Sequence, residues 1–459
     1  MIERLIFRMM LLPVASIMVI AGGIANGAQQ ERRPMDLIPG WTDESLEGFV
    51  AEDIWPSRHP LLINLVARLR NISASSVERY LVSTADLEID RELLSDDAWH
   101  GYFFDLQGNA ISVQQIKLDK ELAERVGLDR LLLTTVELAS GIKCQVVSDR
   151  VPEIWETKPN SLNEFIRCPG LLLKTLDDGR PVFITERLGW FPKQVSQSLG
   201  VSDSHVWLSN HGVDLSLLDL LEMKSVQPIN RQETELFLQM LSTVSNVDSV
   251  TPQALEQQVV GWLEAPPEHV GKFYRIDGHV RRVTRVAVED PALRQRYDLE
   301  SYFQLDVFIE HPDLVVNIVD EQGKPVLDND GYPVTYKGQY SVMVFCDQLP
   351  DELKLGNELS QNVNLEVSIG CFYLKTIRHK NFRSRTAQGE YWKDTPMLVG
   401  FPPLKAKLIP GPTWPYTLGV VLSSGLLGLF LFYAWRFSRQ DQAGRKNSSE
   451  LPEKIDLDF

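Results

Sequence analysis

Residues 101–108 read Gly101-Tyr-Phe-Phe-Asp-Leu-Gln-Gly108, and residues 271–278 read Gly271-Lys-Phe-Tyr-Arg-Ile-Asp-Gly278. Both octapeptides begin and end with glycine, carry phenylalanine at the third place and an aliphatic residue at the sixth. Short aromatic and aliphatic runs bounded by turn residues are typical of β-strands. The pair therefore suggests that one β-rich domain occurs twice in the chain.

Three further pairs of segments follow in the same order in both halves. They are Val147-Ser-Asp-Arg-Val-Pro152 with Phe345-Cys-Asp-Gln-Leu-Pro350, Leu173-Lys-Thr175 with Leu374-Lys-Thr376, and Leu188-Gly-Trp-Phe-Pro192 with Val399-Gly-Phe-Pro402. The sequence offsets of the four pairs are 170, 198, 201 and about 211. Offsets that grow along the chain indicate insertions in the second copy. The ordered set predicts an internal duplication.

The strand pattern between these marks predicts small β-barrels. Crossover helices are missing between most of the strands, so we expect mainly antiparallel sheets. Five strands, with a glycine after the first half-strand and a long bent fourth strand, resemble the OB-fold over roughly 100–192 and 270–409. Another small β-barrel or a sandwich also fits these marks. The resemblance implies that one barrel face and its loops bind oligonucleotides, oligosaccharides or proteins.

Segments with helical spacing of apolar residues precede each barrel. They cover 61–69 and 74–81 before the first barrel, and 216–223, 231–244 and 251–263 before the second. Thr251-Pro252 predicts a helix that begins there, with threonine as N-cap and proline at the first helical position. The repeated unit is therefore expected to be short helices followed by a barrel, which places the chain in the α+β class.

The two ends predict secretion and a membrane anchor. Two arginines, an apolar run and small residues at Ala25-Asn-Gly27 follow the order of a signal peptide, either cleaved or retained. The segment from Trp414 to Trp435 has no charged residue, ends in aromatic residues and precedes Arg436 and Arg439. At about 1.5 Å per residue it spans roughly 33 Å, which predicts one transmembrane helix with its basic side in the cytoplasm.

These signals divide the chain into seven predicted parts. They are a signal peptide (1–27), an N-terminal helical segment (28–99), a first OB-like barrel (100–195), a second helical segment (196–268), a second OB-like barrel with a hairpin insertion (269–410), a transmembrane helix (414–435) and a cytoplasmic tail (436–459). The predicted localisation is the cell membrane, with a single pass and most of the chain extracytoplasmic. The chain also resembles large envelope proteins of planctomycete-type bacteria.

Charge narrows the classes of ligand. The chain has 46 Lys and Arg against 62 Asp and Glu, a net charge of −16, which argues against generic binding to nucleic acid. A basic cluster in the second copy reverses this negative charge locally and is the candidate ligand site. Its expected ligand is either a phosphate-bearing or acidic glycan polymer, or lipid headgroups. The alternative is a solvated turn that pairs with nearby acids. The cluster comprises Arg281, Arg282, Arg285, Arg378, His379, Lys380, Arg383 and Arg385.

The four cysteines fall in pairs, one pair in each copy. Cys144 and Cys168 are 24 residues apart, and Cys346 and Cys371 are 25 apart. In an oxidising compartment each pair is a disulfide candidate, and the alternative is four buried thiols. Asp328-Asn-Asp-Gly331 in the insertion resembles the start of a calcium loop, but Gln339 stands where an EF-hand needs glutamate, so we expect a hairpin there.

The sequence favours a binding role over catalysis. G-x-S-x-G, H-E-x-x-H and P-loop motifs are absent, and the eight histidines are scattered. No catalytic residue, metal or cofactor is therefore predicted. The leading hypothesis is a single-pass, membrane-anchored binding or assembly protein whose partner is an envelope protein or a glycan. The alternatives are a cell-wall hydrolase or transferase with its site between the two copies, and a structural subunit of a membrane complex.

Overall fold

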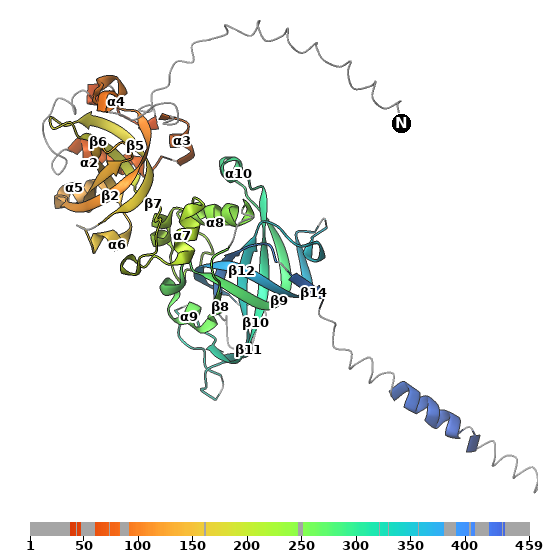
Figure 1. Cartoon of the computed structure of the whole chain (residues 1–459). Helices are drawn as coiled ribbons and strands as arrows, with labels where there is room; N and C mark the ends of the chain where they lie inside the picture. Colours follow the sequence, from red (N-terminus) through yellow and green to blue (C-terminus); the bar gives the residue numbers. More distant parts are fainter. Residues whose placement is uncertain are drawn as a thin grey trace, which may run out of the picture.

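The protein is an α+β molecule built around two β-sheets, as a computed structural model shows (Figure 1). The described residues are 37–42, 44–46, 60–72, 74–82, 91–159, 162–246, 251–320, 322–328, 330–356, 358–380, 392–403, 405–408, 422–433 and 435–436. The predicted signal peptide and most of the predicted cytoplasmic tail lie outside them.

The first sheet closes into a five-stranded barrel, which confirms a barrel-like domain here. Its strands are β2 (Phe103–Lys117), β3 (Arg130–Leu138), β4 (Lys143–Arg150), β5 (Glu164–Thr175) and β6 (Pro181–Arg187). They pair in the order β2-β3-β4-β6-β5, and β5 pairs back onto β2. Only β4 and β6 run parallel among these pairs. The sequence pattern predicts two separate strands at Tyr102–Leu106 and Ile111–Leu118, whereas the structure has the single long strand β2 there.

The second sheet repeats this cyclic order of strands. Its five main strands are β9 (Phe273–Ala287), β10 (Ser301–Asn317), β11 (Thr335–Cys346), β12 (Ser360–Lys380) and β13 (Trp392–Gly400). They pair in the order β9-β10-β11-β13-β12, and β12 pairs back onto β9. Again only β11 and β13 run parallel among these pairs. A short edge strand, β14 (Lys405–Leu408), adds to β12.

The sequence marks of the repeat occupy equivalent places in the two sheets. Gly101 donates its N–H to the carbonyl of Leu172, and Gly271 donates to the carbonyl of Tyr373, at 2.7 and 2.9 Å. Directly after each acceptor, the pairing of the fourth and fifth strands shifts register. The Leu-Lys-Thr marks therefore follow the same bulge in both copies, which bends the long fourth strand.

The repeat also includes the elements before each barrel. The short strand β1 (Leu81–Val82) runs parallel to β2, as β8 (Leu255–Glu256) does to β9. A helix and a 3₁₀ turn then lead into the first barrel strand in both copies. These are α4 (Arg91–Ser95) with η3 (Asp97–Trp99), and α9 (Val259–Glu264) with η6 (Pro266–His269). The helix predicted to begin at Thr251 therefore begins only at Val259, because β8 precedes it.

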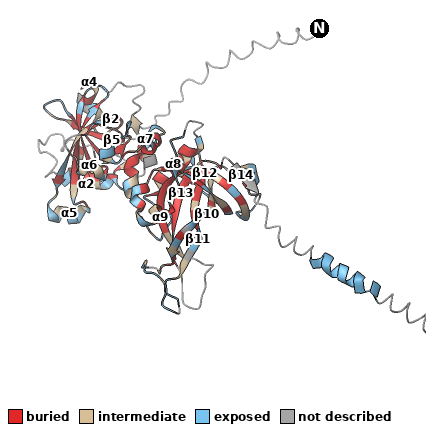
Figure 2. Ribbon diagram, turned by 60° about the horizontal axis from the view of Figure 1, so that its bottom comes forward, coloured by how far each residue is buried: buried red, intermediate tan, exposed pale blue. Residues whose placement is uncertain are grey.

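One longer helix covers the outside of each barrel at the same pair of strands. Helix α2 (Pro60–Leu69) contacts β4 and β6, and α8 (Thr234–Asn246) contacts the equivalent strands β11 and β13. Alternating residues of the strands point outward to these helices and inward to the barrel cores. Thus Leu133 packs outside under α2, while Leu132 and Val136 lie inside. Figure 2 shows both sheets and these helices largely buried.

The prediction of a transmembrane helix over 414–435 is wrong. Within the described part of the chain, no helix is both long enough and apolar enough to span a membrane. The described residues of this segment that are helical are 422–433 and 435–436. Their described side chains are exposed (Figure 2).

Candidate functional site

The two barrels meet through the segment between β6 and α8, and this junction contains a candidate site. The segment holds α7 (Asp203–Asn210) and the 3₁₀ helix η5 (Leu215–Leu220). One hydrophobic core runs from the inside of the first barrel, through Trp207 and Leu217 of this segment, to the outside of the second barrel at Phe372. The junction is therefore packed like a domain interior.

Helix α7 is attached to the start of the second barrel. Ser204 accepts a hydrogen bond at its Oγ from the N–H of Phe273, at 3.0 Å. The ring of Trp207 stacks on Phe372 with 5.2 Å between centroids. His205 Nδ1 accepts from the N–H of Ser202, so Nε2 carries the proton and donates to the carbonyl of Val270, at 2.9 Å. Burial lowers the pKa of His205 and keeps the imidazole neutral in this role.

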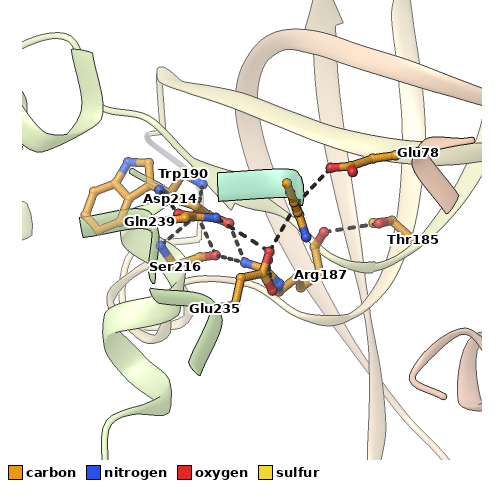
Figure 3. Close-up of polar contacts among 9 residues, drawn as sticks. Glu78, Thr185, Arg187, Trp190, Asp214, Ser216, Glu235 and Gln239 are labelled. Carbon is orange, nitrogen blue, oxygen red and sulfur yellow. Dashed lines mark hydrogen bonds and ion pairs between the residues drawn. The ribbon is translucent and has the colours of Figure 1, made fainter. Parts of the chain in front are cut away.

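A network of ions joins both barrels to the segment between them (Figure 3). Arg187, at the end of β6, pairs with Asp214 and, at 3.3 Å, with Glu235 of α8. Glu235 also pairs at 3.4 Å with Arg296, which lies in α10 (Pro291–Tyr297) of the second barrel. Arg296 in turn binds Glu78, before the first barrel, at 2.8 Å. Although burial opposes the charge, the surrounding carboxylates raise the pKa of Arg187.

Asp214 is the buried centre of this network. Its Oδ1 accepts from the N–H groups of Trp190 and Ser216, both at 2.9 Å, and from the Ser216 hydroxyl at 2.7 Å. Its own N–H donates to Gln239 of α8. The carboxylate is thus fully engaged in positioning the chain, and the network serves as a structural connection between the barrels.

Beside this network lies a cleft of about 590 Å³ that is lined by both copies. Its lining is mostly apolar and includes three carboxylates and one lysine. The apolar lining residues are Trp190, Leu199, Val201, Leu215, Leu218, Leu221, Met223, Pro267 and Val270. The charged lining residues are Glu153, Asp219, Glu268 and Lys272. We call this space the junction cleft.

Asp219 is the residue of the junction cleft whose ionisation is most altered. Its Oδ2 accepts from the N–H of Glu153 at 2.9 Å, which joins η5 to the helix after β4. The residue as a whole is exposed at the cleft, yet desolvation of its carboxyl among the lining residues raises its pKa to about 6. The negative charges of Glu153 and Asp214 add to the rise. Asp219 therefore holds its proton to a higher pH than an ordinary aspartate does.

The predicted basic cluster is only partly assembled, and several members have partners. Arg282 pairs with Asp306 at 2.6 Å, and Arg378 binds Asp394 through two hydrogen bonds, at 2.7 and 3.1 Å. Arg281 donates to Asn364 and Arg285 to Ser301. Lys380 lies over the ring of Trp392. Arg383 and Arg385 lie outside the described residues. Two of these contacts, those of Arg282 and Arg378, are with acids, and the candidate ligand site stays a prediction.

All four cysteines are free and buried in the structure. Cys144 and Cys168 lie on neighbouring parts of the first barrel wall, and Cys346 and Cys371 lie in the core of the second. Burial raises the pKa of Cys144 to about 12 and raises those of the other three thiols as well. The predicted disulfides are therefore not formed here, and the thiols pack as small apolar groups.

The described residues contain no group of His, Cys, Asp or Glu side chains arranged to hold a metal ion. In the insertion, Asp328 Oδ1 accepts from the N–H groups of Asp330 and Tyr332, both at 2.9 Å. Bridges at Val319 and Leu327 continue the β10–β11 hairpin. The carboxylate of Asp328 therefore closes a turn, as the hairpin prediction requires.

Sequence reasoning missed the residues of the junction cleft. Glu153, Asp219 and Glu268 come from three separate connections and belong to no motif. The available signal was indirect. Glu153 directly follows the repeat segment that ends at Pro152, and Glu268 shortly precedes the one that begins at Gly271.

Comparison with known proteins gives no family for this chain. It matches no protein-family model, and no curated protein matches it. The barrel-like domains are therefore established by the structure alone. The OB-fold name and the resemblance to planctomycete-type envelope proteins stay predictions.

Proposed function

We propose that the chain is an extracytoplasmic binding or assembly protein of the cell envelope, which holds a segment of a partner protein in the junction cleft. The observation that carries this proposal is the cleft of about 590 Å³ where the two barrel units meet. Ligand sites occur preferentially at such domain junctions and have volumes of about 300–1,000 Å³. The ion network of Arg187 and the packed core keep the walls of this cleft preformed.

The barrel topology supports the finer assignment to OB-like domains. In both cycles the fourth strand returns beside the first, after three consecutive antiparallel strands, which is Greek-key order. A five-stranded Greek-key barrel is the OB arrangement. The outer faces of β4 with β6 and of β11 with β13 are already covered by α2 and α8. The junction cleft is the open site that this arrangement leaves between the copies.

The lining of the cleft favours a polypeptide ligand over a glycan. Its lining is mostly apolar, and the indole N–H of its Trp190 is already bound to Glu164 at 2.9 Å. Three lining carboxylates, Glu153, Asp219 and Glu268, outweigh Lys272. A segment with aliphatic residues followed by lysine or arginine complements both features.

A photoreactive amino acid placed in the cleft tests this proposal. The full chain would carry it at Leu199, which lines the cleft, or at Val195, which is 51% exposed on the same connection outside it. Irradiation in the native host should give a discrete protein adduct from position 199 and none from 195, and Glu268→Lys should abolish it. Equal adducts from both positions, or an adduct that digests as glycan, would contradict the proposal.

A second candidate function is hydrolysis of cell-wall material in the same cleft. The observation that favours it is the raised pKa of Asp219, because a carboxyl that keeps its proton up to a pH of about 6 can act as a general acid in mildly acidic conditions. Glu153, whose N–H binds Asp219, supplies a second carboxylate within the same lining. The reaction would need Asp219 protonated, so its rate should fall as pH rises through about 6.

Asp219→Asn separates the two candidate functions. Asparagine keeps the hydrogen bond to Glu153 but cannot donate a proton to a leaving group. Release of soluble fragments from cell-wall material should disappear in this variant if Asp219 is the acid, whereas partner binding should persist. The same substitution tests the pKa through stability. Because folding raises the pKa, wild-type stability should fall relative to the variant as pH rises from about 4 to about 6.

A further inference from the structure

A second polar cluster lies on the outer face of the second barrel, away from the junction cleft. Strands β11 and β13 run parallel there, with Met343 opposite Met397. Ser341 and Lys393 precede these residues by two and four positions, so both point to the same face as the methionines. The Lys393 ammonium reaches the Ser341 hydroxyl at 2.7 Å. The methionine end of this face is packed against the core under α8, and the cluster lies beyond it.

Burial of Lys393 favours its uncharged form. Its Nζ also lies 4.1 Å from the centre of the Tyr340 ring, a contact that by itself favours the charged amine. Burial lowers the pKa of Lys393 to about 8, while the charge of Asp306 acts in the opposite direction. His379, which stands opposite Lys393 on β12, also has a lowered pKa because of burial and the Lys393 charge. A large fraction of the amine is therefore neutral just above physiological pH.

The chain contains another serine–lysine contact with very different surroundings. Lys375 donates to Ser225 at 2.9 Å and to Glu233 at 2.7 Å. The side chains of Lys375 and Glu233 are both 0% exposed, so the carboxylate holds the ammonium in a site closed to solvent. Ser341 and Lys393, in contrast, are both partly exposed. Of the two pairs, the one on the outer face is therefore the one in contact with solvent.

We propose that Ser341 is a nucleophile activated by Lys393, and that this pair reacts with carboxylic esters or similarly activated acyl groups. Lysine replaces histidine as the general base in some serine hydrolases, and it needs to be desolvated for this role. The Lys393 amine takes the hydroxyl proton as the Ser341 oxygen bonds to the acyl carbon. The bond to the leaving alcohol then breaks, and the alcohol departs with that proton. Water then attacks the acyl-serine and gives a proton to Lys393 as its oxygen bonds to the acyl carbon. The bond from that carbon to the Ser341 oxygen breaks, Lys393 returns the proton to Ser341, and the carboxylic acid is released.

A fluorophosphonate probe tests the pair directly in the full chain. It phosphonylates an activated serine with loss of fluoride, and peptide mass spectrometry locates the adduct. We expect the adduct at Ser341, with a labelling rate that rises with pH and has its midpoint near 8. In Lys393→Arg the side chain still donates to Ser341 but cannot take its proton. Labelling should then slow by about 100-fold or more, the usual loss when a general base is removed.

Matched controls exclude general serine reactivity and misfolding. Ser225→Ala removes the hydroxyl of the closed pair and should leave labelling unchanged. Ser360, on the neighbouring strand β12, should label no faster than unfolded chain. The proposal is overturned if Ser341 carries no adduct, if Lys393 carries it, or if Lys393→Arg labels at the wild-type rate. Should Lys393→Arg fail to fold, a wild-type labelling rate without a midpoint near 8 overturns it as well.

Discussion

Glycines in the first strand of each barrel mark a close approach between strands. A side chain at Gly108 would place its Cβ 2.4 Å from the carbonyl oxygen of Glu137, and one at Gly278 would lie 2.6 Å from that of Phe308. Real Cβ atoms do not approach backbone so closely. The last glycine of each octapeptide therefore permits the first strand to lie close against the second as the barrel closes.

Gly278→Ala should lower the free energy of unfolding by about 1–3 kcal/mol, because the strands must separate to admit the methyl group. Urea unfolding followed by circular dichroism measures the change. Gly356→Ala is the matched control, since no atom lies within 4 Å of its added Cβ. The control should stay within about 0.5 kcal/mol of wild type. Equal effects at both glycines would show that the close approach is not what matters.

The buried ion pair of Lys375 and Glu233 depends on both partners. Glu233 also accepts from the N–H groups of Glu222 and Asn230, at 2.8 and 2.9 Å, so its charge organises the connection before α8. Lys375→Met leaves this carboxylate buried without its cation and should cost about 3–5 kcal/mol.

The double variant Lys375→Met with Glu233→Gln tests that account by a double-mutant cycle. Since the neutral amide needs no counter-ion, the pair of substitutions should cost clearly less than the sum of the two single changes. Chemical denaturation of the four proteins gives the coupling energy. Strict additivity would mean that the two side chains contribute separately.

At the scale of elements, each barrel has its own covering helix. Helix α2 presents Leu62, Leu65 and Val66 to the first barrel, and α8 presents Leu238 and Leu241 to the core at the second. The amphipathic spacing of these helices was readable in the sequence. The strands that these helices cover were not readable in the sequence. The outward residues of β4 and β6 are brought together under α2 only when the barrel closes.

Leu65→Ala should destabilise the protein by about 2–5 kcal/mol, because it leaves a cavity between α2 and the first barrel. Leu61→Ala, in the same helix, is its control. Leu65 is 1% exposed and Leu61 is 41% exposed, so the control should change stability by less than about 0.5 kcal/mol. Thermal unfolding distinguishes the two. Similar losses from both substitutions would argue that helix propensity rather than burial stabilises α2.

At the scale of the whole molecule, we expect the network centred on Arg187 and Asp214 to make the two barrels unfold together. Arg187→Met leaves the buried Asp214 without its cation and should cost about 3–5 kcal/mol. Arg167→Met removes a pair with Asp105 in which the arginine is 59% exposed, and should cost at most about 1 kcal/mol. Differential scanning calorimetry should show the single transition of wild type broaden or split for Arg187→Met alone.

An unsplit transition with an unchanged midpoint in Arg187→Met would mean that the shared hydrophobic core joins the barrels by itself. Trp207, which stacks on Phe372 of the second barrel, would then be the residue to substitute next. The two outcomes distinguish electrostatic from apolar coupling between the copies.

The sequence by itself determined the two β-domains and their internal order. Strand alternation and turn glycines are local properties, so they can be read from neighbouring residues. The transmembrane helix predicted from the uncharged run at 414–435 was wrong, since no described helix is long and apolar enough to span a membrane.

Only the tertiary structure decided which distant residues meet. Lys375 pairs with Glu233 across 142 positions, Lys393 meets Ser341 across 52, and the carboxylates of the junction cleft come from three connections. The chemistry of these groups depends on burial, which lowers the pKa of Lys393 and raises that of Asp219. Burial arises from how whole barrels pack, and no local pattern in the sequence encodes it.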